Sequence, residues 1–197
     1  MSNDPRFGRF EELAANATSN VDELGALAME IGADLAGMRA LVDRYAEAGT
    51  IAGFAGIPLA WRPLKWSNSE KRQQGPQLRE LVFDYVNKSH QTDDRRTLEA
   101  CGGALRVLDI LRYLKPRTIE HKTTLGSFLR RSLNHDSVFV VAEGLEVLHG
   151  LVFRGDPRDF LVPSDVLAVR ERVARVAEER GDEFENELNH LRGFLQD

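Results

Sequence analysis

An internal repeat of 40 residues constrains the fold of this chain more than any other feature of its sequence. The stretch LRVLDILRY at 105–113 aligns with LEVLHGLVF at 145–153, with leucine or valine at the same four places and Tyr113 matching Phe153. A weaker third copy, LNHLRGFLQ, lies at 188–196. Periods of about 40–47 residues with two helices per unit are typical of helical solenoids, whose units bury their apolar faces only by stacking.

The turn and helix at 133–148, LNHDSVFVVAEGLEVL, resemble the turn and second helix of a HEAT repeat. In that family an acidic turn residue precedes a valine, an alanine and a leucine at helical spacing, and the matching residues here are Asp136, Val138, Ala142 and Leu145. Phe139 stands where the family has an arginine, and the family's proline is missing. TDDRRTLEACGGALRVL at 92–108 is a looser copy. The resemblance covers mainly 77–153 and implies a HEAT/armadillo-like, all-α solenoid of about three helix pairs.

Apolar periodicity predicts that everything after Pro76 is helical. Helix 137–153 is apolar on most of its circumference, which places it at the centre of the domain, with neighbours on both sides. The last helices are rich in glutamate and suit a polar cap on an open end. The six expected helices span 77–89, 97–114, 117–134, 137–153, 165–180 and 183–195.

Nearer the N-terminus, apolar residues recur at alternating steps of four and three. This heptad pattern predicts one helix over 20–47, with Asn20 and Glu23 at the spacing of a capping box and Gly49 after its end. Its apolar seam either packs against the rest of the chain or mediates self-association with a second copy. The seam residues are Leu24, Ala28, Ile31, Leu35, Met38, Val42 and Tyr45.

Residues 50–76 contain glycines and prolines that argue against a continuous helix, because proline lacks an amide donor and disfavours helical conformation before it. The expected conformation is an extended aromatic strap, broken at Pro58 and Pro63. This divides the chain into an N-terminal helical segment at 1–49, a connector at 50–76 and a helical-repeat domain at 77–197.

The strap includes FAGIPLAWRPLKW at 54–66, which holds both tryptophans of the chain. A segment this apolar must lie on something. It either straps the N-terminal helix internally or meets a protein partner, and we expect one tryptophan packed on the chain's own helices and the other partly exposed. Tryptophan and arginine are enriched at binding hot spots, and the candidate partner-binding residues are Trp61, Arg62, Leu64, Lys65 and Trp66.

Charge is distributed unevenly along the chain. Residues 1–61 carry 4 basic and 9 acidic groups, residues 62–135 carry 15 and 8, and residues 136–197 carry 7 and 14. The basic middle either attracts the acidic ends within the fold or meets an acidic surface. A nucleic-acid-binding or regulatory role is therefore the alternative function, through segment 112–131 and the residues Arg112, Lys115, Arg117, Lys122, Arg130 and Arg131.

The sequence contains no phosphate loop, nucleophile elbow or paired-histidine zinc motif. We therefore expect no catalytic residues, no metal site and no cofactor, and an interaction or assembly protein rather than an enzyme. Cys101 is the only cysteine, so internal disulfides are impossible and a cytoplasmic location is expected. No run approaches the roughly 18 apolar residues of a membrane span, and the N-terminus has no signal-peptide core.

Overall fold

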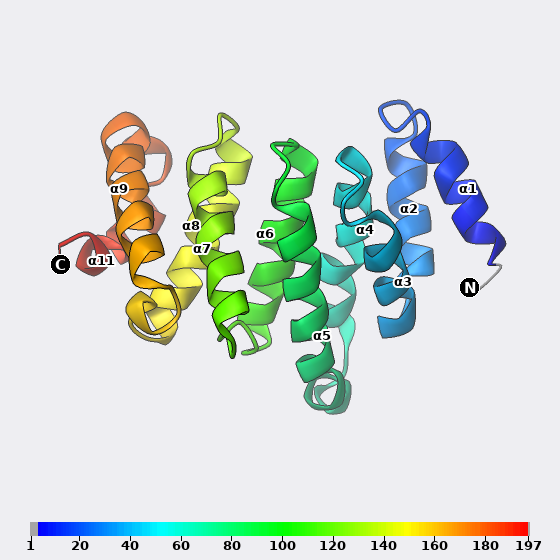
Figure 1. The fold of residues 1–197 in the computed structure, drawn as a ribbon, viewed down its shortest axis with the longest axis horizontal. Helices are drawn as coiled ribbons and strands as arrows, with labels where there is room; N and C mark the ends of the chain where they lie inside the picture. The colour runs from blue at the N-terminus through cyan, green and yellow to red at the C-terminus, as the bar shows by residue number, and fades with distance from the viewer. Residues whose placement is uncertain (1–3, 197) are drawn as a thin grey trace.

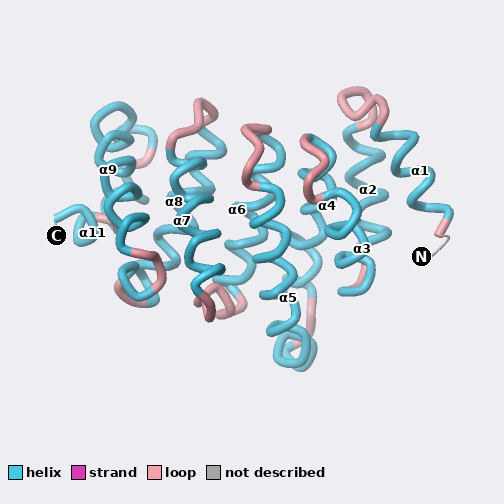
Figure 2. Tube along the Cα trace, viewed as in Figure 1, coloured by secondary structure: helices cyan, strands magenta, loops and turns pink. Residues whose placement is uncertain are grey.

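The computed structural model describes residues 4–196, and within that range the chain is all-α, without a strand (Figures 1 and 2). Residues 1–3 and 197, the outer ends of the first and third predicted domains, lie outside the described range. The helices are α1 (Pro5–Ala14), α2 (Val21–Ile31), α3 (Leu35–Tyr45), α4 (Thr50–Trp61), η1 (Arg62–Lys65), α5 (Asn68–Ser89), α6 (Arg95–Ile110), α7 (Ile119–Leu133), α8 (Val138–Arg154), η2 (Pro157–Asp159), α9 (Pro163–Arg180), η3 (Gly181–Glu183), α10 (Glu185–His190) and α11 (Arg192–Gln196).

The helices stack in two layers along one row, with the described ends of the chain at opposite ends of the row (Figure 1). Each even-numbered helix from α2 to α8 packs on the next even-numbered one, and each odd-numbered helix from α3 to α9 packs on the next odd-numbered one. Successive helices such as α5 and α6, or α7 and α8, pair across the layers. The all-α, solenoid-like class expected from the sequence is confirmed.

The 40-residue repeat corresponds to equivalent helices of neighbouring pairs. α8 contains the second copy, and α6 contains the first copy up to Ile110; the two helices contact each other and run in the same direction (Figure 1). Leu105 and Leu145, which occupy matching places in the repeat, are both fully buried. The repeat therefore reflects a real equivalence of position in the stack.

The single N-terminal heptad helix is wrong. The first helix, α2, ends at Ile31, and Gly32 follows it. Asp34 then caps a new helix, α3, by accepting a hydrogen bond from the Gly37 amide at 2.8 Å. A local cap thus competes with continuation of the helix. Asn20 does precede α2, but its side chain donates to the Leu13 carbonyl instead of capping. The seam residues are buried in the same chain, apart from the half-buried Leu35.

The extended strap over 50–76 is also wrong, because α4, η1 and the start of α5 occupy it. Pro58 lies inside α4 and removes one hydrogen bond from the helix. Helix α4 tolerates this because it is buried on most sides, so apolar packing outweighs the lost bond. Pro63 lies in the first turn of η1, where a missing amide costs little.

Helix α5 begins earlier than expected. Ser67 and Glu70 form a full capping box, in which Ser67 N donates to Glu70 Oε2 at 2.7 Å and Glu70 N donates to Ser67 Oγ at 3.3 Å. The helix continues through Pro76, which is exposed. Its first turns project beyond the ends of the neighbouring helices at the lower edge of Figure 1.

Buried apolar side chains form two clusters that share helices. The smaller cluster includes Phe10 and Phe54, and the larger runs from α3 to α11. α3 contributes Leu41 to the smaller cluster and Val42 to the larger, and α4 likewise contributes to both. Packing is therefore continuous across residues 49 and 76, the expected domain boundaries.

Candidate functional site

The two tryptophans have different environments. Trp66 caps η1 in extended conformation and is partly buried against the larger core cluster. Trp61 ends α4 and is 61% exposed. One tryptophan is thus packed on the chain's own helices and the other is exposed, as expected from the sequence, although the segment is helical rather than extended.

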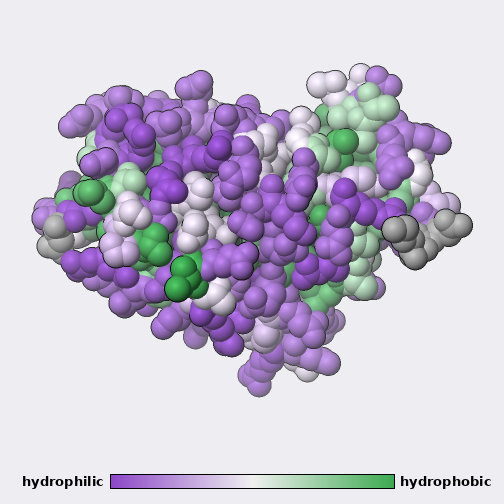
Figure 3. All heavy atoms as spheres, in the orientation of Figure 1, coloured by the Kyte–Doolittle hydropathy of each residue, from purple (hydrophilic) through white to green (hydrophobic). Residues whose placement is uncertain are grey.

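Trp61 lies in a groove of about 380 Å³ on the even-numbered layer. Ile57 and Leu64 lie beside it in the chain, and α6 contributes Val107 and Ile110 from the facing wall. Ile110 is 59% exposed, so Trp61 and Ile110 present two large exposed apolar side chains in the same depression. We call this depression the Trp61 groove. By contrast, the face nearest the viewer in Figure 3, where α5, α7 and α9 lie, is largely hydrophilic.

Close packing of α4 on α6 forms the floor of the Trp61 groove. A Cβ added to Gly53 would lie 2.9 Å from the Arg96 carbonyl carbon and 3.0 Å from the Thr97 amide nitrogen. One added to Gly103 would lie 3.2 Å from the Ala60 Cβ. The distances at Gly53 are too short for a side chain, and the one at Gly103 would require a small shift, so the two glycines let the helices pack closely.

Four charged side chains line the groove: Arg96, whose guanidinium lies over the Phe54 ring, and Glu99, Arg106 and Glu143, which take part in ion pairs. Arg106 Nη1 donates to Glu143 Oε1 at 3.0 Å, joining α6 to α8. Arg95 Nε donates to Glu99 Oε1 at 2.6 Å within α6. Burial raises the pKa of the Glu143 carboxyl, although Arg106 acts in the opposite direction. The groove thus has an apolar interior and a rim of balanced charge.

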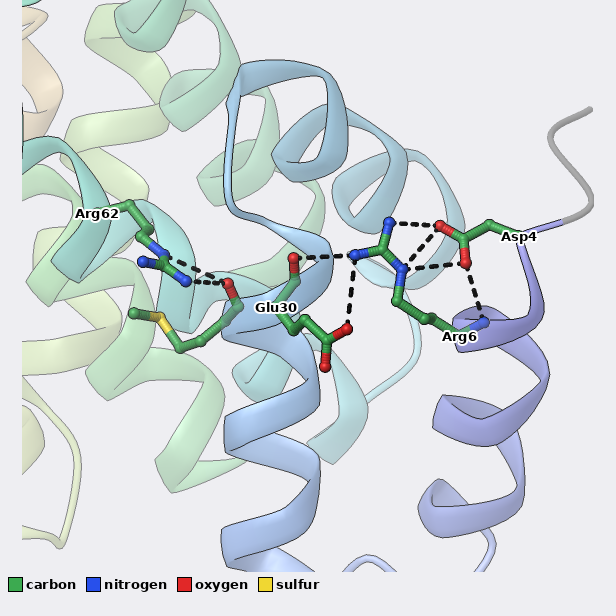
Figure 4. A network of polar contacts seen from close by, with 5 residues as sticks. Asp4, Arg6, Glu30 and Arg62 are labelled. Atoms are coloured by element: carbon green, nitrogen blue, oxygen red, sulfur yellow. Dashed lines mark hydrogen bonds and ion pairs between the residues drawn. The ribbon is translucent and has the colours of Figure 1, made fainter.

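Arg62 and Lys65, the two cations of the predicted partner-binding segment, have different surroundings. Arg62 is half-buried and points back to α2, where its Nη2 donates to the Met29 carbonyl at 2.6 Å (Figure 4). Its hydrogen bonds therefore tie η1 to the chain itself. Lys65 is exposed and does not line the groove. Of the five candidate residues, Trp61 and Leu64 lie in the groove.

The six basic candidates for nucleic acid do not form one patch. Arg112, Lys115 and Arg117 lie at or before the start of α7, whereas Arg130 and Arg131 lie near its other end. Lys122 lies within α7 and is half-buried. The arginines at the far end are paired: Arg130 with the buried Asp165, and Arg131 with Asp93 at 2.7 Å. The expectation that these residues gather near one turn is wrong.

The interior carries few features of a reaction centre. Cys101 is fully buried, and burial raises the pKa of its thiol, which makes it less reactive. His121 stacks on Phe83 at 4.0 Å, and burial lowers the pKa of its imidazole. Between residues 4 and 196, no group of three or more His, Cys, Asp or Glu side chains is placed to hold a metal ion. No helix in that same range is long and apolar enough to span a bilayer.

Sequence reasoning missed the far wall of the groove. Val107 and Ile110 on α6 and Glu143 on α8 line it together with Trp61, but they are distant from the tryptophan in the chain. The steps of four and three from Gly103 to Val107 and Ile110 are a signal that could have grouped these residues on one helix face. Nothing in that pattern identified α4 as the helix they face.

Fold and site together define an all-helical protein with an apolar groove across one layer of stacked helices. No protein-family model matches the chain, and neither a curated protein nor a solved structure matches it.

Proposed function

We propose that the protein is a non-catalytic adaptor or assembly protein, built on a HEAT-like helical repeat, that binds a protein partner in the Trp61 groove. The observation that carries this proposal is the exposure of Trp61 in an apolar depression floored by tightly packed helices. Charged residues make up 29% of this sequence, but the position at the end of α4 holds a tryptophan. Exposed apolar patches in grooves are typical of interaction sites.

The occupant that fits best is a short apolar segment of another protein. The groove offers apolar walls to the side chains of that segment. Most charges at its rim are paired, Arg106 with Glu143 and Arg95 with Glu99, whereas Arg96 lies over the Phe54 ring. A highly charged partner would gain little from such a rim. We also propose that the protein works in the cytoplasm, where the reducing environment makes disulfides rare, since its single cysteine, Cys101, is free and buried.

Capture from a nuclease-treated lysate of the native host tests the proposal with three baits: the wild type, Trp61→Ala and Leu167→Ala. Leu167 is the matched control, because it lies on α9 and is also 61% exposed. A protein retained by the wild type and Leu167→Ala but lost with Trp61→Ala supports the groove. If every captured protein is retained by Trp61→Ala, the proposal is wrong.

Fluorescence then locates the contact. In Trp66→Phe, the remaining tryptophan is Trp61, whose emission should be that of a solvated indole accessible to a soluble quencher. Addition of the captured partner should shift this emission to the blue and reduce quenching. Sedimentation of the bait alone identifies the competing case, since burial of Trp61 by a second copy would appear as a dimer.

A further inference from the structure

Two hollows adjoin each other at the edge of the molecule that is lowest in Figure 2, where the chain connects α6 to α7 and α8 to α9. The first, of about 490 Å³, is lined by Lys71 and Arg72 of α5 and by residues at the end of α6. The second, of about 360 Å³, is lined by Lys115 and by residues at the end of α8. Arg112 lines both hollows, and we call the pair the cationic edge.

The cationic edge has an unbalanced charge. No aspartate or glutamate lines either hollow, whereas three other hollows, the Trp61 groove among them, each include at least one. Within residues 4–196, the side chains of Lys71, Arg72 and Arg112 have no ion pair or hydrogen bond. Arg154, at the edge of the second hollow, pairs with Asp109, but no carboxylate pairs with these three cations.

Arg112 is held in an uncommon backbone conformation. Its φ is 65°, and it is the sole non-glycine residue with a positive φ among residues 4–196. It follows the end of α6, where Tyr113 N donates to the Leu108 carbonyl at 2.7 Å, the hydrogen bond that normally accompanies a glycine at this position. An arginine here costs stability relative to glycine. Such strain persists at functional sites more often than elsewhere.

An aromatic ring accompanies the cations in each hollow. Tyr113 lines the first, and its ring lies so close to α5 that a side chain on Gly75 would collide with it. Phe153 lines the second and is 81% exposed. Cations that follow a backbone, with aromatic rings on which bases stack, are the recurring features of sites for single-stranded nucleic acid.

We propose that the cationic edge binds single-stranded nucleic acid, with phosphates against Lys71, Arg72, Arg112 and Lys115 and unpaired bases near Tyr113 and Phe153. A duplex keeps its bases stacked inside and cannot offer them to these rings. Single-stranded nucleic acid offers a phosphate and a flat base at every nucleotide, which matches cations and rings placed together. This site differs from the one expected at 112–131, because it lacks Arg130 and Arg131 and includes α5.

Fluorescence anisotropy of a labelled oligothymidylate, measured with the full chain at several salt concentrations, tests the proposal. Each neutralised phosphate contributes about −0.7 to the slope of log K against log salt for single strands, so four cations predict a slope between about −2 and −3. Arg72→Ala should reduce this slope by about 0.7. Phe153→Ala should weaken binding several-fold while leaving the slope unchanged, because it removes stacking and no charge.

Arg112→Gly separates binding from structure. Glycine relieves the left-handed strain, so this variant should melt at the wild-type temperature or above it and still bind several-fold more weakly. Arg175→Ala is the matched control: it removes an exposed cation on α9, outside both hollows, and should not alter affinity beyond error.

Three results would overturn the proposal. The first is absence of binding at low salt, and the second is equal affinity for wild type and Arg112→Gly. The third is equally tight binding of a duplex or of polyglutamate with the same dependence on these variants, which would make the edge a general polyanion or acidic-protein surface.

Discussion

Replacing Gly53 by alanine should destabilise the protein, although alanine is the better helix former. The added Cβ would lie 2.9 Å from the Arg96 carbonyl carbon and 2.7 Å from its Cγ. Backbone atoms cannot rotate away as the end of a side chain can, so α4 and α6 must separate. Two hydrogen bonds cross the same junction: Thr97 Oγ1 donates to the Gly49 carbonyl at 2.9 Å, and Thr50 Oγ1 donates to Asp94 Oδ1 at 3.0 Å.

The magnitude follows from three contributions. Overpacking of a tight interface costs about 1–3 kcal/mol, and weakening the two hydrogen bonds costs up to about 1 kcal/mol each. The gain in helix propensity from glycine to alanine is about 1 kcal/mol. Taking the middle of each range, the net loss of stability for Gly53→Ala should be about 2 kcal/mol, which lowers the melting temperature by about 4–8 °C in a chain of this size.

Gly8→Ala is the matched control. Gly8 lies within α1, and an added Cβ there would meet no other atom within 4 Å. The same substitution should therefore stabilise the protein by up to about 1 kcal/mol. Thermal melts and urea titrations of both variants decide the matter. A Gly53→Ala protein as stable as the wild type would show that α4 and α6 do not need the close approach on which the groove floor depends.

Three further predictions concern single side chains. Leu145→Ala should cost about 2–5 kcal/mol by urea denaturation, because the leucine is fully buried between stacked helices, whereas the exposed Leu167→Ala should change stability by less than about 0.5 kcal/mol. Arg130→Ala leaves the buried Asp165 carboxylate unpaired and should cost about 2–3 kcal/mol, less than the roughly 3–5 kcal/mol for fully buried pairs because Arg130 is itself 38% exposed; the exposed Arg117→Ala should be nearly neutral in the same melts. Burial raises the folded-state pKa of Glu143 above its ordinary value of 4.5. The contribution of Glu143 to the free energy of unfolding is therefore most favourable below pH 4.5 and declines as pH rises through the folded-state pKa. Glu143→Gln should raise the melting temperature at neutral pH and have no such effect near pH 4.5.

Helix periodicity predicted those parts of the fold in which local preference and tertiary packing agree. The copies in α6 and α8 are apolar at regular spacing, contain no proline and are helical, except that α6 ends at Ile110 and not at the expected residue 114. The heptad pattern over 20–47 was misleading because the spacing of apolar residues carries no information about where a side chain caps a helix. Asp34 starts a new helix, yet the seam residues on both sides of it remain on the packed face of the chain. Periodicity thus identified the buried face and missed the break in the backbone.

Pro58 misled the sequence analysis for the opposite reason. Local preference forbids a helix there, but α4 is buried between α2, α3 and α6, and the packing energy of its apolar side chains exceeds the cost of one missing hydrogen bond. That energy depends on neighbours distant in the chain, so it cannot be computed from residues 50–61 alone. The Trp61 groove is hidden for the same reason, since one wall belongs to α4 and the other to α6.

The two proposed binding surfaces meet at one residue. Ile110 lines the Trp61 groove and also the first hollow of the cationic edge, and it is among the most exposed aliphatic side chains of the chain. A partner segment that reaches the end of the groove therefore contacts the side chain that borders the site proposed for nucleic acid. Because any effect of one ligand on the affinity of another is reciprocal, the coupling between the two ligands must be the same from whichever side it is measured. If both ligands bind, the end of α6 is where they would meet, because Ile110 lies there, two residues before the strained Arg112.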